Sequence, residues 1–167
     1  LAVQAKSGTN GASDVANLQK EADSLMDEIT RISKDTAFTG VKYIGTEAGT
    51  KLIQVGYNDG DTISITTNKV DSISLGLVID ADADSVNDRG EYLDISSATA
   101  LASITTAIDR VSGYKAAWGA SQNRLDYTVS NLMNVVEFTS AARSRIEDAD
   151  FAVEAAKLAT AQVLQQM

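Results

Sequence analysis

The chain has 167 residues and a mass of 17.6 kDa, which suits a single domain or one domain with a small insert. It contains no cysteine, histidine or proline. This excludes disulfides and thiol chemistry, and it also excludes catalysis by histidine and metal binding through cysteine or histidine. The 23 acidic and 14 basic residues give a formal charge of −9, so we expect neither a nucleic-acid nor a membrane partner.

The N-terminal residues predict a short helical stub followed by a long amphipathic helix. Residues 1–6 match the last turn of a helix, which the polar run at 7–11 interrupts. Apolar residues then recur in alternating steps of three and four, the spacing of a heptad seam, at Val15, Leu18, Ala22, Leu25, Ile29 and Ile32. We expect Ser13 to be the N-cap, Asp14 to lie in the first turn and the Thr39-Gly40 pair to end the segment.

The middle of the chain alternates with period two and predicts strands. Two β-branched runs, at 53–57 and 63–65, flank the turn sequence at 58–61, which is typical of a β-hairpin. The apolar run at 73–79 predicts a further strand. The acidic stretch at 80–94 is expected to be a solvated loop.

The third region predicts a long helix capped by Ser96 or Ser97. Its seam consists of Ile104, Ile108, Val111, Trp118, Leu125, Val129, Leu132 and Val136. The same register places Lys115 and Gln122 on the seam, so the pattern is imperfect. A stripe of roughly five heptads needs a partner, and the helix at 15–32 covers only part of it. We expect the rest to be exposed or to pair with segments outside this sequence.

Leu1 and Met167 both lie inside helical patterns, so we expect the sequence to be a piece of a longer protein. Within the long helix, Tyr114 and Trp118 are four residues apart. An exposed aromatic anchor for a partner is one interpretation, but the seam position of Trp118 favours packing in the core.

The sequence favours no enzymatic activity. No phosphate-binding or dinucleotide-binding glycine motif occurs, and Ser/His, Cys/His and zinc-binding arrangements are all impossible. Five acidic residues match positions 1, 3, 5, 9 and 12 of an EF-hand-like calcium loop: Asp80, Asp82, Asp84, Asp88 and Glu91. Position 6, which requires glycine, is Ser85, so a plain acidic loop is favoured. We expect no cofactor, and calcium is the one alternative.

The segment at 140–151 places two arginines just before three acidic residues. Arg143 and Glu147 have the i,i+4 spacing of a helical ion pair. The small and charged residues carry no seam, which predicts a change of helix partner or a break before Phe151.

Three strings in the second half resemble the C-terminal signature of flagellin, the subunit of the bacterial flagellar filament. They are Gln122–Leu125, Ser140–Ala152 and Ala161–Gln166. The first half is similar to the family at shorter matches such as Leu1–Gln4 and Phe38–Val41, and the Asn58–Ile65 hairpin also resembles that of flagellins. The resemblance covers about residues 1–66 and 98–167.

The resemblance implies a mainly α fold with a small β part, in which an elongated helical rod or bundle carries a β-hairpin insert. Residues 1–40 and 95–150 are then a discontinuous helical rod domain, and 151–167 begin the C-terminal filament-core helix. Residues 41–94 hold the hairpin and a short acidic insert in place of a variable outer domain. The joint between rod and core is expected at Arg143, Arg145, Glu147, Asp148, Asp150 and Phe151.

The function implied by the resemblance is that of an extracellular, non-enzymatic filament subunit. Its partners are other flagellin subunits, together with the flagellar export machinery and chaperones, since such proteins leave the cell through the flagellar export channel. The hairpin residues Asn58, Asp59, Gly60, Ile63 and Ile65 form a candidate switch of filament supercoiling. The positions matching the surface recognised by Toll-like receptor 5 are Leu1, Gln4, Glu21 and Asn123. The alternative is a flagellin-like cell-surface protein that binds a polysaccharide or calcium.

Overall fold

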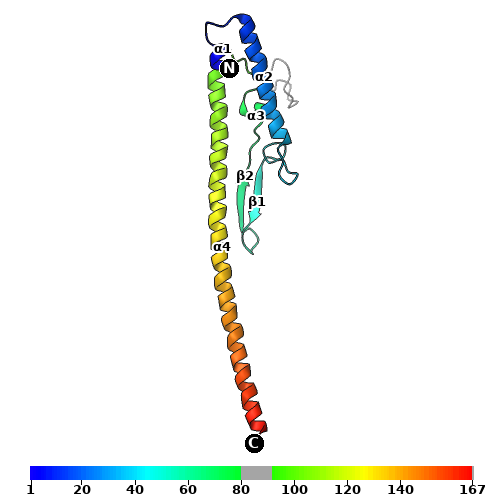
Figure 1. The fold of residues 1–167 in the computed structure, drawn as a ribbon, viewed down its shortest axis with the longest axis vertical. Helices are drawn as coiled ribbons and strands as arrows, with labels where there is room; N and C mark the ends of the chain where they lie inside the picture. The colour runs from blue at the N-terminus through cyan, green and yellow to red at the C-terminus, as the bar shows by residue number, and fades with distance from the viewer. Residues whose placement is uncertain (80–91, 167) are drawn as a thin grey trace. The chain divides into compact units, whose positions relative to one another are not determined.

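The computed structural model describes residues 1–79 and 92–166 and consists of four helices and one two-stranded sheet within these residues (Figure 1). The elements in chain order are α1 (Ala2–Ala5), α2 (Ala12–Asp35), β1 (Thr50–Gln54), β2 (Thr62–Thr66), α3 (Ser72–Leu75) and α4 (Ala100–Gln165). The mainly α fold with a small β part is therefore confirmed. The chain divides into an N-terminal unit, Leu1–Ser121, and a C-terminal unit, Gln122–Met167, and we describe each unit by itself.

The helix α2 begins earlier and ends later than its seam indicates. The N-cap is Gly11, not Ser13, and the helix begins at the next residue, Ala12. The Asp14 carboxylate accepts a hydrogen bond from the Gly11 N–H at 3.1 Å, which stabilises this start. The helix ends at Asp35. The chain then turns at Thr39 and Gly40, whose φ angles of 51° and 83° are both left-handed.

The buried face of α2 differs in part from the predicted seam. Ala22 is buried as expected, whereas Leu25 and Ile32 are 52% and 47% exposed. The buried positions after Ala22 are Met26, Thr30 and Ser33, one residue further along the helix than three of the seam positions. Two of these positions, Thr30 and Ser33, are small and polar, and they make hydrogen bonds to the segments that follow α2.

Two serines make these docking bonds. The Ser72 hydroxyl donates to the Met26 carbonyl, and the Ser72 N–H donates to the Thr30 hydroxyl at 3.2 Å. The Ser33 hydroxyl donates to the Ile44 carbonyl at 2.5 Å. The three side chains are buried, and each bond satisfies a polar group that burial would otherwise penalise.

The hairpin prediction is confirmed. Strands β1 and β2 pair antiparallel, with Ile53 opposite Ile63. Ile63 is buried, and the Asp61 carbonyl accepts a bond from the Val55 N–H at 2.8 Å just beyond the ladder. The turn at 58–61 therefore joins the two strands as its sequence indicates.

The expected strand at 73–79 is wrong, because its first part is the helix α3. The Asp71 carboxylate caps this helix by accepting from the Ser74 N–H at 2.6 Å, and Gly76 ends it in a left-handed conformation with φ 80°. A short apolar run does not separate a strand from a buried turn of helix. Only Val78 has a strand-like partner, an isolated bridge to Tyr92. Tyr92 and Leu93 are half-buried and therefore differ from the expected solvated loop, whereas Asp94 is exposed as expected.

The long helix α4 is confirmed, but its start is shifted. It begins at Ala100, beyond both expected caps, and continues to Gln165. The expected break before Phe151 is wrong, since α4 continues through this region. The core of the N-terminal unit consists of Ala2, Ala5, Ala22, Met26, Leu75, Leu77, Val78, Ile95 and Ala107.

Candidate functional site

The inner face of α4 within the N-terminal unit follows a different register from the predicted seam. Ala107 is buried where Ile108 was expected, and Ile108 is 60% exposed. Tyr114 is half-buried, whereas Lys115 is exposed. The seam steps from 104 to 107 and from 111 to 114, by three residues and not four, which removes the lysine from the packed face. Trp118 is half-buried, in agreement with the interpretation as a packed residue.

An open apolar groove of about 550 Å³ lies between α1, α2, α3 and the beginning of α4. Leu25 and Ile29 line it from α2, and Ile104, Ile108 and Val111 line it from α4. Leu25, which α2 leaves exposed on the predicted seam, therefore lines this groove together with the apolar residues of α4, whereas Ile32 does not line it. The groove offers mainly apolar contacts, and no group of polar side chains suited to catalysis lines it.

Two α4 side chains reach across to backbone carbonyls of the N-terminal unit. The Arg110 guanidinium donates from Nη1 to the Ser74 carbonyl of α3 at 3.0 Å. The Trp118 indole donates from Nε1 to the Thr66 carbonyl, at the end of β2, at 3.1 Å. In Figure 1 the hairpin and α3 lie beside this part of α4. The two bonds attach α4 to α3 and the hairpin at separate points.

The described side chains of the C-terminal unit are all exposed except Leu125 and Thr128, which are half-buried. The exposed side chains include large apolar ones along the whole segment: Val129, Leu132, Met133, Val135, Val136, Phe138, Ile146, Phe151, Val153, Leu158, Val163 and Leu164. A shallow groove of about 700 Å³ lies along Val129, Leu132, Met133 and Val136. Such a run of exposed apolar residues is typical of an interaction surface.

The residues of the expected joint lie on one continuous helical segment. The predicted ion pair is confirmed, with Arg143 Nε 2.9 Å from Glu147 Oε1. Ser144 donates to the Asp148 carboxylate at 3.1 Å. Arg145 is exposed and Phe151 is 77% exposed. The side chain of Asp150 lies outside the described residues.

The remaining candidate residues fall into two groups. Leu1, Gln4 and Glu21 of the proposed receptor surface are exposed in the N-terminal unit, and Leu1 also lines the groove; Asn123 is exposed in the C-terminal unit. At the hairpin, the tip residues Asn58, Asp59 and Gly60 are exposed, Ile63 is buried and Ile65 is half-buried. The tip is held by the Asp61 carboxylate, which accepts from the Asn58 N–H at 3.1 Å.

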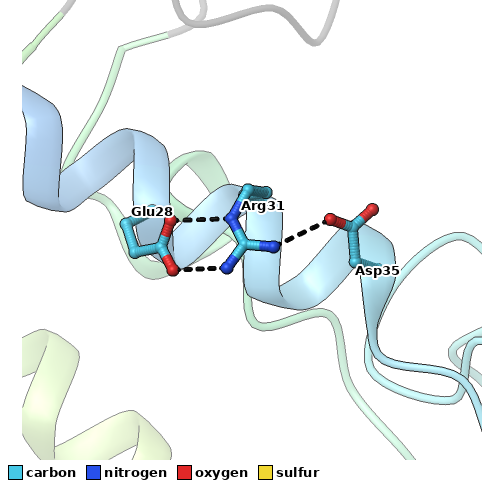
Figure 2. A network of polar contacts seen from close by, with 3 residues as sticks. All are labelled: Glu28, Arg31 and Asp35. Carbon is cyan, nitrogen blue, oxygen red and sulfur yellow. Dashed lines mark hydrogen bonds and ion pairs between the residues drawn. The ribbon is translucent and has the colours of Figure 1, made fainter.

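The outer face of α2 carries a polar network (Figure 2). Arg31 donates from Nε and Nη2 to both oxygens of Glu28, at 2.7 and 2.6 Å, and from Nη1 to Asp35 at 3.1 Å. The hydrogen bonds from Arg31 lower the pKa of Glu28, and those to Glu28 and then Asp35 raise the pKa of Arg31. Elsewhere, the hydrogen bond from the Ser96 hydroxyl lowers the pKa of Asp94. These groups are exposed and stay charged at neutral pH.

Sequence patterns gave no indication of a clasp made by Gln19. Its amide Nε2 donates to the Leu93 carbonyl at 3.0 Å, and its Oε1 accepts from the Ile95 N–H at 2.9 Å. Tyr92 adds a bond from its hydroxyl to the Asp27 carboxylate at 2.7 Å. Together they attach the segment before α4 to α2. The sequence alone does not distinguish a helix glutamine that makes such bonds from one that is only solvated.

The calcium-loop residues Asp80, Asp82, Asp84, Asp88 and Glu91 lie outside the described residues. Among the residues that the structure describes, no three acidic side chains gather in a way that could hold a metal ion. Within the same residues, no helix combines the length and the apolar character needed to cross a membrane.

Known proteins similar to this chain are flagellins. A family model of the bacterial flagellin C-terminal helical region matches residues 101–167. The flagellin-related protein YvzB of Bacillus subtilis strain 168 is 38% identical over 133 residues, which cover 79% of each chain. This chain belongs to the flagellin family.

Longer flagellins match as well. The flagellin of Halalkalibacterium halodurans is 35% identical over 170 residues, 99% of this chain and 58% of that protein. Flagellin 1 of Proteus mirabilis is 48% identical over 80 residues, 48% of this chain and 22% of that protein. This chain therefore matches little more than half the length of the first relative and less than a quarter of the second. The crystal structure of Bacillus cereus flagellin superposes with a TM-score of 0.57 at 29% identity and covers 78% of this chain and 70% of that one.

Proposed function

We propose that this chain is part of the structural subunit of a bacterial flagellar filament, outside the cell, with no catalytic role. The observation that carries the proposal is the run of exposed apolar side chains on α4 from Val129 to Leu164, which finds no partner among the described residues of its own unit. A flagellin gains stability by burying such a surface between molecules.

Assembly is then the mechanism. Each buried Å² of apolar surface contributes roughly 25 cal/mol, so many copies packed along their α4 helices form a stable polymer. Contacts between unlike faces of identical subunits, repeated with a rotation that does not close, produce a helical array. The flagellar export machinery and its chaperones are the partners of the subunit before it joins the filament.

Two finer roles belong to the same proposal. The hairpin residues 58–65 act as the switch of filament supercoiling, supported by an exposed tip on a buried base at Ile63. The segment Arg143–Phe151 is the joint between rod domain and filament core, supported by its exposed, ion-paired surface.

The decisive experiment is electron microscopy of the full-length protein after salting out, which strengthens apolar association. Filaments are expected for the wild type and for the control Asn134→Asp, which adds a charge to another exposed position of α4. Val136→Asp adds the same charge to the apolar groove and should prevent assembly. Dispersed wild-type particles would instead favour the alternative, a flagellin-like surface protein that binds a polysaccharide or calcium.

Recognition by Toll-like receptor 5 is the second proposed role, supported by the exposure of Leu1, Gln4 and Glu21. A pull-down with the receptor ectodomain tests it. Glu21→Lys should lose retention, while Glu154→Lys, the same exchange on the C-terminal unit, should keep it. Equal retention of both variants, or none of the wild type, would remove this role.

A further inference from the structure

Arg110 and Trp118 make the two polar bonds from α4 to α3 and β2 described above, in a region where the other contacts are apolar. Apolar contacts carry no direction, and the groove between α2 and α4 is open, so these contacts define the axial position of α4 less sharply than a hydrogen bond does. A hydrogen bond tolerates only a few tenths of an ångström around roughly 2.9 Å. Directional bonds are therefore what can select one position of α4.

The two donors are well placed to do this together. They lie eight residues apart in the sequence, which corresponds to about 12 Å along the helix axis. Arg110 binds the Ser74 carbonyl in the last turn of α3, where helix carbonyls lack intrahelical partners. Trp118 binds Thr66, at the end of β2. A slide of α4 by one helical turn, about 5.4 Å, breaks both bonds at once.

We propose that Arg110 and Trp118 act as one device that fixes the axial register of α4 against α3 and the hairpin. They are positioning residues: a displacement of the hairpin pulls on Trp118, and a displacement of α3 pulls on Arg110. Through this pair, a movement of the small β part is transmitted to the long helix. The consequence for filament shape rests on the proposed function, whereas the register itself is a property of the single chain.

Trp118 is the only tryptophan in the chain, so its indole N–H gives a single resonance in a nitrogen–proton NMR spectrum. The exchange rate of that proton with solvent measures how often the bond to Thr66 opens. If the two bonds form one register, Arg110→Met should speed exchange of the Trp118 proton about fivefold, the factor expected from one lost hydrogen bond. Arg124→Met, the same exchange elsewhere on α4, is the matched control and should leave the rate unchanged.

Arg110→Lys keeps a donor that can reach the Ser74 carbonyl and should restore slow exchange, which a general loss of stability would not allow. It also keeps the test decisive if Arg110→Met fails to fold. An exchange rate in Arg110→Met equal to that of Arg124→Met, or fast exchange in a folded Arg110→Lys, overturns the proposal.

The filament-level test uses Trp118→Phe, which keeps an aromatic ring but removes the donor. Tyr127→Phe, at a 78% exposed aromatic residue of α4, is its control. In the full-length protein, we expect Trp118→Phe to change the helical form of the filament and Tyr127→Phe to leave it unchanged. Identical filaments would contradict transmission through the pair. If the wild type forms no filament, the proposed function fails while the exchange measurements still decide the register.

Discussion

The part of α4 in the N-terminal unit and the part in the C-terminal unit differ in what their side chains contact. In the N-terminal unit, Ala100 and Ala107 are buried, and Arg110 and Trp118 bind other elements. In the C-terminal unit no described side chain is buried, and the polar contacts between its described side chains, such as Arg143 with Glu147, stay within the helix. The first part of α4 therefore packs against other elements of the fold, whereas the remainder exposes its side chains to solvent.

The largest expected effect on stability comes from placing the same charge in each of the two parts of α4. Ala107→Asp buries a carboxylate at a position only 5% exposed and should lower the free energy of unfolding by about 3 kcal/mol. Val136→Asp, at a 67% exposed position, should change it by less than about 0.5 kcal/mol. Urea unfolding followed by circular dichroism measures both. Equal losses would mean that the two parts do not differ as described.

A second effect concerns the contact that packs the segment between α2 and β1 against the end of α2. A Cβ added at Gly45 would lie 2.6 Å from the Ser33 carbonyl oxygen, so Gly45→Ala must displace backbone and should cost about 2 kcal/mol. Gly8→Ala is the control, since a Cβ there meets nothing within 4 Å. Thermal unfolding of the two variants gives the comparison, and a Gly45→Ala protein as stable as Gly8→Ala would show that this contact yields easily.

The features that could be predicted from sequence are those fixed by neighbours along the chain. The hairpin follows from its turn, and the ion pair of Arg143 and Glu147 follows from helical spacing. The predictions that were wrong concern features that depend on a partner far away in the sequence. A heptad pattern allows either residue 107 or residue 108 of α4 to face inward, and either residue 25 or residue 26 of α2. The elements that pack against these helices decide between the two. The strand expected at 73–79 failed for the same reason, because Ser72 docks on α2 as part of a helical turn.

The Gln19 clasp offers a smaller effect that belongs to the N-terminal unit alone. Gln19→Ala removes its bonds to Leu93 and Ile95 and should lower the free energy of unfolding by about 1 kcal/mol, because two backbone groups lose their partner at a half-buried site. Gln122→Ala, at an exposed glutamine of α4, should have almost no effect. Amide exchange at Ile95 provides a local check, and it should accelerate in the first variant only.

The smallest effect is the pH dependence carried by the network of Figure 2. Hydrogen bonds from Arg31 lower the pKa of Glu28 below its ordinary value of 4.5, so the folded state binds this proton less readily than the unfolded state. The stabilisation is therefore complete above about pH 4.5 and is lost as the pH falls through the folded-state pKa. Because the pair is exposed, its contribution is small and screened by salt.

Glu28→Gln removes the titrating group while keeping the size of the side chain. The difference in urea midpoint between wild type and Glu28→Gln should favour the wild type at pH 6 and shrink at pH 3, and 1 M salt should reduce it further. Glu154→Gln, at an exposed acid of the C-terminal unit with a single contact to Lys157 at 3.4 Å, is the control and should show a weaker pH dependence. An equally large response from Glu154 would mean that the bidentate geometry of Arg31 adds nothing, and that exposed pairs in both units contribute alike.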